Sequence, residues 1–133
     1  MKESKINIAE LLLEQDASKI RDLPTAQIRI TRLSDIIGAD FCLEIRALTG
    51  AEIESMPDGM EGIDRKILTA VKNFDFTNAQ LRGKFTPDGR CTPLTPTELI
   101  DVLLLPGEKI QTVRKINDLS GYTDDAVEVI RKN

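Results

Sequence analysis

The sequence predicts a single domain of mainly α-helical α+β class, in which one N-terminal β-hairpin packs on a small helical domain. Two short stretches alternate apolar and polar residues, the second half repeats apolar residues every three or four positions, and proline and glycine separate the segments. The 133 residues, 41% of them hydrophobic, are enough for one packed core. We expect an N-terminal helical segment over residues 1–24, the hairpin over 25–48 and a helical region over 49–133.

The first segment is predicted to be a helix from Ile6 to about Lys19. Its apolar residues Ile8, Leu11 and Leu12 are at helical spacing. Asn7 can cap its first turn, because asparagine side chains accept hydrogen bonds from free backbone N–H groups there. The helix is expected to end before Leu23 and Pro24.

The hairpin is predicted from two alternating stretches, residues 26–32 and 41–47. In the second stretch Phe41, Leu43 and Ile45 fall on one side. Residues 34–38 between the strands are expected to form a turn, or a single helical turn closed by glycine. Because an isolated two-stranded hairpin is marginally stable in water, its apolar face must pack on helices or on another chain.

The helical region begins with a capping box formed by Thr49 and Glu52, and this first helix is expected to end at Pro57. The following helix has the clearest helical period in the chain. Phe76, Leu81 and Phe85 continue as apolar anchors before a turn over residues 86–90. The residues on the apolar face of that second helix are Met60, Ile63, Ile67, Ala70, Val71 and Phe74.

Three further helices are predicted towards the C-terminus. Thr95 caps the first of them, with Pro96 in its first turn and Glu98 completing a capping box. Pro106 begins the next, and Gly121 ends it. Its apolar stripe is Ile110, Val113, Ile116 and Leu119, and its polar face carries Lys109, Arg114, Lys115 and Asp118. Thr123 is expected to cap a last helix with Ala126, Val127 and Ile130 facing inward, and Lys132 near its end.

The composition removes several classes of chemistry. Histidine is absent, which excludes Ser-His-Asp and Cys-His catalysis and zinc sites built on histidine. Two acidic clusters occur, Asp58 with Glu61 and Asp64, and residues 124–128, but both fall in predicted first helical turns, where carboxylates favour the helix dipole. We therefore expect no catalytic residues, no metal site and no cofactor, and the protein is not predicted to be an enzyme.

The surroundings and partners are also constrained. A net charge of −4 and an aromatic content of 4% disfavour a nucleic-acid surface. The longest apolar run, residues 102–105, is far shorter than the roughly 20 residues of a membrane helix. Cys42 and Cys91 match no metal-binding spacing, and we expect reduced thiols in a cytoplasmic protein, with a disulfide as the less favoured alternative.

The most informative motif is the run Leu103, Leu104, Leu105, Pro106 and Gly107. The proline ends one helix and begins another, so the two helices meet at a fixed bend. Leucines around the whole circumference before the bend indicate burial on more than one side. Two interpretations stay open: the run is part of the core, or it is a partner-facing surface such as a helix-binding groove or an oligomer contact.

Several stretches of the chain resemble the XkdN-like tail assembly chaperones of tailed phages and prophages. The strongest match lies in residues 95–100, in the Leu-Leu-Leu-Pro-Gly-Glu run that ends at residue 108, and in residues 119–122. Further matches are residues 11–16, 45–53, 73–76 and Leu81, and together they span most of the chain in order.

The resemblance implies a non-enzymatic chaperone that coats the tape-measure protein during tail morphogenesis and helps to bring tail-tube subunits to it. Such proteins act in the bacterial host cytoplasm, are absent from the mature virion and self-associate. A tape-measure helix presents apolar faces, which a leucine-rich surface can bind. The expected partner-binding residues are Leu103, Leu104, Leu105, Pro106, Gly107, Leu119 and Tyr122.

Two other functions remain open at this stage. The chain could be a structural tail-completion or head–tail connector protein of the phage particle. It could also be an adaptor that uses residues 97–119 as a helix pair resembling a helix-turn-helix. The basic side chains Lys109, Arg114 and Lys115 favour the adaptor, whereas the acidic charge of the whole chain opposes DNA binding.

Overall fold

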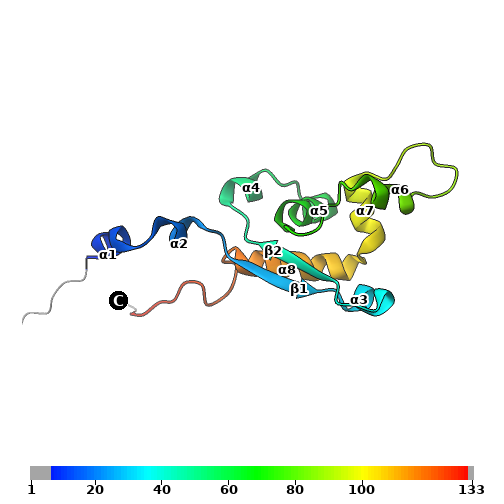
Figure 1. Ribbon diagram of the computed structural model, residues 1–133. Helices are drawn as coiled ribbons and strands as arrows, with labels where there is room; N and C mark the ends of the chain where they lie inside the picture. The colour runs from blue at the N-terminus through cyan, green and yellow to red at the C-terminus, as the bar shows by residue number, and fades with distance from the viewer. Residues whose placement is uncertain (1–6, 132–133) are drawn as a thin grey trace, which may run out of the picture.

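The computed structural model describes residues 7–131 and has the predicted mainly helical α+β class. One antiparallel sheet of two strands lies beside α8, with α4 and α5 on the other side of that helix and α6 and α7 at its far end (Figure 1). The elements in chain order are α1 (Ile8–Glu14), α2 (Ala17–Arg21), β1 (Thr25–Arg29), α3 (Thr31–Ile37), β2 (Cys42–Arg46), α4 (Gly50–Glu54), α5 (Gly59–Ala70), α6 (Ala79–Lys84), α7 (Pro96–Leu103) and α8 (Pro106–Leu119).

The two predicted strands pair in the antiparallel sense, with Gln27 opposite Glu44. They lie at 25–46, after two helices, so the hairpin is not the first element of the chain. Its connection is the two-turn helix α3, which ends at Gly38 with a positive φ of 72°. The helical turn expected here is therefore present and longer than predicted. Glycine suits this position because it reaches the left-handed region without strain.

Both strands are shorter than predicted. Ile30 already caps α3, although its amide still donates to the carbonyl of Phe41 at 2.9 Å. The Ser34 hydroxyl donates to the carbonyl of Ile30 at 2.8 Å and accepts from the amide of Phe41, also at 2.8 Å. This buried serine holds the two ends of the α3 connection together, which a simple alternation of residues does not reveal.

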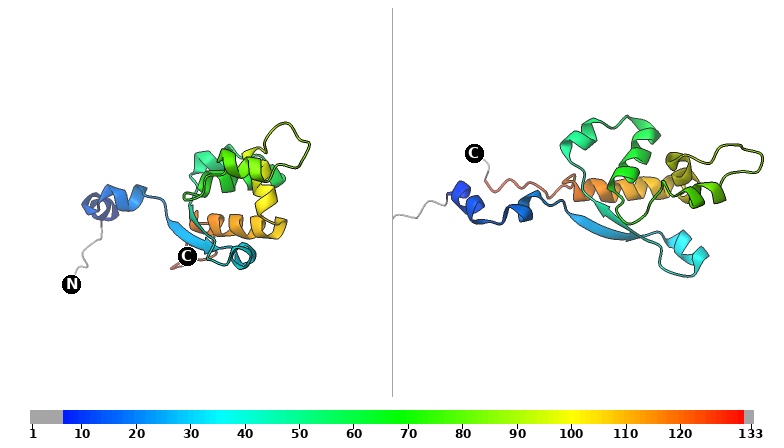
Figure 2. Two further views of the ribbon diagram at one scale, coloured as in Figure 1. Left: turned by 45° about the vertical axis from the view of Figure 1, so that its right-hand side comes forward. Right: turned by 45° about the horizontal axis from the view of Figure 1, so that its top comes forward.

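The N-terminal segment forms two short helices where one was predicted. The carboxylate of Asp16 accepts from the amide of Ser18 at 3.0 Å, so a new helix begins there and α1 ends at Glu14. The predicted cap at Asn7 is confirmed by its hydrogen bond from the amide of Glu10. The expected start at Ile6 lies outside the described residues. No residue of α1 or α2 is buried, and the pair extends away from the body as an arm (Figures 1 and 2).

The core lies between the sheet and helices α5, α7 and α8. Its fully buried members come from all four: Leu43, Ile45, Ile67, Leu99, Ile100, Leu104 and Ile116. Phe41, Phe74 and Phe76 border it as a tilted aromatic row, with ring centroids 5.7 and 4.7 Å apart. The core therefore joins the predicted hairpin to the predicted helical region.

Helix α5 buries Ile67 and Ala70 as predicted, but it ends at Ala70 and leaves Met60 exposed. Phe74 reaches the core from the following loop. Near the start of the helix, Gly62 lies against the preceding loop: an added Cβ would be 1.9 Å from the carbonyl oxygen of Pro57. Any side chain at this position would therefore displace the loop.

Helices α7 and α8 begin as predicted, but α8 turns a different face to the core. Thr95 and Glu98 form the expected capping box, and Pro106 is the first residue of α8. The predicted stripe is wrong at two neighbouring positions, because Lys109 is only 4% exposed and Ile110 is 43% exposed. The buried face is Lys109, Thr112, Val113 and Ile116.

The predicted last helix is absent from residues 123–131, and Ala126, Val127 and Ile130 are exposed. Gly121, with a φ of 92°, ends α8 as expected and turns the chain away from the body. A segment of this length has little helical stability in water without a surface to pack on. Lys132 lies outside the described residues.

Candidate interaction surfaces

The bend between α7 and α8 has both a core side and a solvent side. Leu104 is 2% exposed and belongs to the core, and Leu103 is half-buried against it. Leu105 and Val102 are 53% and 49% exposed. Pro106 and Gly107 are exposed as well. The two interpretations of the leucine run are therefore each correct for part of it: successive leucines point to opposite sides of the bend.

The bend is fixed in place by Arg32 of α3. Its guanidinium donates to the two carboxylate oxygens of Glu108 at 2.9 and 3.1 Å and to the carbonyl of Leu103 at 2.8 Å. Glu108 also accepts from the amide of Leu105 at 2.7 Å. The hydrogen bonds from Arg32 keep the pKa of Glu108 below its ordinary value, so this carboxylate stays ionised at neutral pH. The exposed Leu105 is thus presented from a rigid corner.

Behind the bend, a buried ionic cluster joins three helices. The ammonium of Lys109 on α8 donates to Asp64 of α5 at 3.0 Å and to Asp101 of α7. Burial alone would lower the pKa of Lys109, but its bonds to Asp101 and Asp64 outweigh this and raise it, so the lysine is charged. Sequence reasoning placed Asp64 in an acidic first turn and Lys109 on a polar face. Residues 109, 112, 113 and 116 are at helical spacing and could have indicated the buried face of α8. Two of them, Lys109 and Thr112, are polar, so hydrophobicity alone does not single out this face.

The predicted partner-binding residues do not form one patch. Helix α8 has 14 residues and is therefore about 20 Å long, which separates the bend from Leu119 and Tyr122. Leu119 is half-buried against the core, and Tyr122 is exposed. Tyr122 borders a groove of about 350 Å³ together with Ile53, Lys66, Arg114, Asn117 and Asp118. The structure brings Leu103–Gly107 together at one end of α8 and leaves the other two residues at the opposite end.

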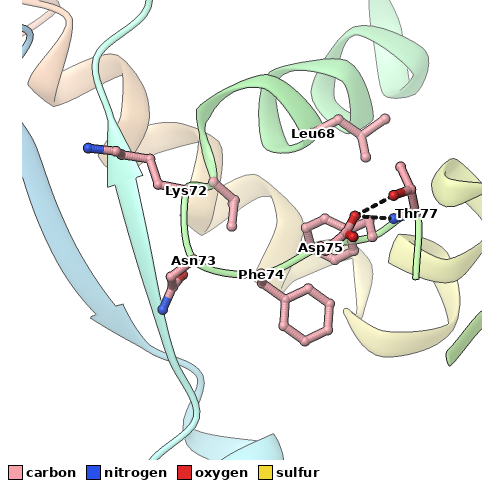
Figure 3. Close-up of a pocket in the computed structure, with 8 residues that line it drawn as sticks. Leu68, Lys72, Asn73, Phe74, Asp75 and Thr77 are labelled. Carbon is pink, nitrogen blue, oxygen red and sulfur yellow. Dashed lines mark hydrogen bonds between the residues drawn. The ribbon is translucent and has the colours of Figure 1, made fainter. Parts of the chain in front are cut away.

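A second hollow of about 480 Å³ lies after α5, where Leu68, Lys72 and the loop from Asn73 to Thr77 meet (Figure 3). Asp75 turns back to Thr77 and accepts from its hydroxyl at 2.5 Å and its amide at 2.8 Å. These bonds, the hydroxyl first, lower the pKa of Asp75. The carboxylate is thus an acceptor that shapes its own loop, and its environment does not raise its pKa as a general acid requires.

The α1–α2 arm presents five large apolar side chains to solvent. Its exposed residues are Ile8, Leu11, Leu12, Leu13 and Ile20. Among the helices described, none combines the length and apolar character needed to cross a bilayer. An arm of this composition, free of its own body, is suited to contacting another protein surface. The sequence predicted these apolar positions as one face of a helix, but no local pattern indicates that the helix leaves the body.

Comparison with known proteins matches most of this chain to one family. Residues 9–132 match the family described as phage XkdN-like tail assembly chaperone protein. No curated protein and no solved structure matches the chain.

Proposed function

Because the chain belongs to the family of phage XkdN-like tail assembly chaperones, we propose that it is a non-enzymatic chaperone that binds the tape-measure protein during tail assembly. The observation that carries the proposal is the family match, which extends over residues 9–132. The family itself assigns the chain to phage tail assembly. The tape-measure protein as client, the tail-tube protein as a further partner and the host cytoplasm as the location belong to the proposal.

We assign the client contact to the bend surface, defined as Val102, Leu105 and Ile110. All three side chains are between 43% and 53% exposed, and they flank the junction that Arg32 holds. A helical client offers an apolar stripe, and a rigid apolar corner binds such a stripe with little loss of side-chain freedom. Leu103 and Leu104 support this surface from the core side. Leu119 and Tyr122 form a separate site at the other end of α8.

Self-association is part of the proposed function, because a chaperone that coats a long client must be present in many copies. The net charge of −4 keeps such copies soluble. Since the finished tail contains no chaperone in this scheme, purified virions should lack the chain. Mass spectrometry of virions that detects the chain at the abundance of tail components would instead identify a structural tail-completion or connector protein.

Co-expression with the tape-measure protein of the same phage tests client binding. The wild-type chain should keep the tape-measure protein in the soluble fraction. The variant Val102→Asp/Leu105→Asp should lower that fraction severalfold, because it places two charges where an apolar stripe docks. Val127→Asp is the matched control, since Val127 is exposed in the C-terminal segment after Gly121 and lies outside the bend surface. If the tape-measure protein precipitates equally with and without the wild-type chain, the proposed function is wrong.

A further inference from the structure

The outer edge of β1 is open. In the antiparallel ladder Ile30 pairs with Phe41 and the carbonyl of Pro24 accepts from the amide of Ala47, so the even-numbered residues direct their backbone groups towards β2. The N–H and C=O groups of Thr25, Gln27 and Arg29 therefore point away from β2. Outside the ladder, the described residues give these groups no hydrogen-bond partner. In Figure 1 and the right-hand view of Figure 2, β1 forms the margin of the body.

The opposite edge, along β2, is covered by the chain itself. The side-chain amide of Asn73 accepts from the amide of Glu44 at 2.7 Å and donates to the carbonyl of Cys42 at 3.1 Å. The amide of Lys72 donates to the carbonyl of Glu44 at 2.8 Å, and Val71 bridges Ile45. A further strand can therefore add only beside β1.

A groove of about 670 Å³ runs alongside the open edge, between β1, the start of α3 and α8. Ile28, Ile30 and Thr112 contribute to its wall, and Arg32 and Lys115 lie along it. Arg32 is engaged by Glu108, and Asp35 of the same groove lies 3.9 Å from Arg29. The described residues place no carboxylate within 4 Å of the Lys115 ammonium. The groove is therefore lined mainly by polar and charged side chains, and Ile28 and Ile30 are its apolar part.

We propose that β1 pairs with β1 of a second copy, antiparallel and centred on Gln27, to give a four-stranded sheet across a two-fold axis. This register places Thr25 of each copy opposite Arg29 of the other, so no like charges face each other across the pair. Each copy supplies the free N–H and C=O groups that the other requires. An edge strand with unpaired backbone groups is a template for such pairing.

The same register explains the groove and the arm. Residues that precede Thr25 continue past Arg29 of the second copy, so Leu23 and Pro24 reach the groove beside its Ile30. The apolar α1–α2 arm, which buries nothing on its own body, is carried over the second copy. Three separate features, the free edge, the groove and the arm, are thus accounted for by one contact.

This inference specifies the self-association included in the proposed function, but it is tested without the tape-measure protein. Loss of client binding with an intact dimer, and loss of the dimer with intact client binding, are therefore distinguishable results.

Cysteine cross-linking tests the register directly. In a Cys42→Ala/Cys91→Ser background, Gln27→Cys places two thiols across the two-fold axis at a Cα separation of about 5.5 Å, which a disulfide can span. Mild oxidation should convert most of this variant into a covalent dimer. Asp88→Cys, in an exposed loop far from β1, is the matched control and should give at least tenfold less dimer. Equal cross-linking of the two variants, or none at Gln27→Cys, would overturn the proposal.

Sedimentation and amide exchange of the full-length chain provide a test without cysteines. The wild-type chain should form a dimer that dissociates on dilution, and the amides of Thr25, Gln27 and Arg29 should exchange at least tenfold more slowly in the dimer. Gln27→Pro removes one outward N–H group and should raise the dissociation constant at least tenfold, whereas Gln27→Ala should leave it within threefold. If Gln27→Pro does not fold, the exchange rates of the wild-type amides still decide. Concentration-independent exchange at all three positions would contradict the pairing.

Discussion

The ammonium of Lys109 on α8 lies 3.0 Å from the carboxylate of Asp64 on α5, and both side chains are only 5% exposed. Asp101 of α7 bonds to the same ammonium from the solvent side, where half of its side chain is exposed. One ammonium group therefore ties α5 to the consecutive helices α7 and α8. A buried pair of this kind can add little net stability, yet removing one member leaves a charge without a partner.

We predict that Lys109→Met destabilises the fold by about 3–5 kcal/mol, because Asp64 is then buried without a counter-charge. The double variant Lys109→Met/Asp64→Leu should recover most of this loss, since two apolar side chains of similar volume replace the pair. Urea unfolding followed by circular dichroism measures both. Lys115→Met, at an exposed position of α8, should change the free energy of unfolding by less than about 0.5 kcal/mol. A loss of that small size for Lys109→Met would mean that the pair is not buried.

The stability should depend on the ionisation of Glu52 in acid. Arg46 donates to both of its oxygens, at 2.9 and 2.7 Å, and the amide of Thr49 donates at 2.9 Å. The hydrogen bonds from Arg46, followed by that from Thr49, lower the pKa of Glu52 from 4.5 to about 2. A carboxyl group whose pKa is lower in the folded than in the unfolded chain stabilises the fold above the unfolded pKa, and this stabilisation is lost as the pH falls through the folded pKa.

We therefore predict that Glu52→Gln is less stable than wild type at pH 7 and that the difference shrinks between pH 4.5 and 2. Urea unfolding at pH 7, 4.5, 3 and 2.5 measures it. Glu54→Gln, at an exposed position of the same helix, controls for the general loss of an acidic residue. A stability difference between Glu52→Gln and wild type that is constant down to pH 2.5 would contradict the assigned role of Arg46.

Adjacent leucines at the bend should respond in opposite ways to the same substitution. Leu104→Asp places a carboxylate in the core and should unfold the chain, because truncating a buried leucine alone costs about 2–5 kcal/mol. Leu105→Asp should leave the far-ultraviolet circular dichroism and the unfolding midpoint near wild type, since its side chain is half in solvent. If both variants unfold, the bend has no solvent side and the client surface assigned to it cannot exist.

Gly62 should tolerate no side chain. We predict that Gly62→Ala destabilises the fold by at least about 1–3 kcal/mol, because the new methyl group overlaps the carbonyl of Pro57 and forces the loop to move. Gly107→Ala is the matched control: it lies in the first turn of α8, and an added Cβ meets nothing within 4 Å. That variant should be neutral or more stable than wild type by up to about 1 kcal/mol. Thermal unfolding of the two variants side by side checks the difference.

Local signals predicted the starts of α4, α7 and α8. Both capping boxes, at Thr49 and Thr95, are present with hydrogen bonds of 2.9–3.2 Å, and Pro106 begins α8. Such signals depend on residues three positions apart, so the sequence contains them directly. The alternation in both strands was equally readable, because its two faces differ in burial along β2.

Features that depend on distant residues could not be read in the same way. Lys109 is buried because Asp64, 45 positions away, offers a partner, and without that partner a lysine belongs on the surface. The tail after Gly121 has the caps and apolar spacing of a helix, but it finds no surface to pack on. Periodicity identifies residues that can be buried, whereas the tertiary fold decides which of them are.

The candidate site was predicted in part for the same reason. The leucine run marked the correct bend, but only the fold shows that Leu104 points to the core and Leu105 to solvent. The hydrogen bonds from Arg32 to Glu108 join residues 76 positions apart, and no local pattern in the sequence indicates them. Tyr122 is separated from the bend by the length of α8, about 20 Å, although both belong to the set of residues predicted from the sequence.

The amide of Asn73 has a consequence for how this protein avoids aggregation. If both edges of a small sheet were open, strands of other copies could add at each edge without limit, which is how fibres begin. Here a single side chain imitates a neighbouring strand along β2, by accepting from one backbone group and donating to another. Together with the backbone of Val71 and Lys72, this side chain blocks growth from that side. The small sheet can therefore add a strand only beside β1, so edge-to-edge growth stops at two copies.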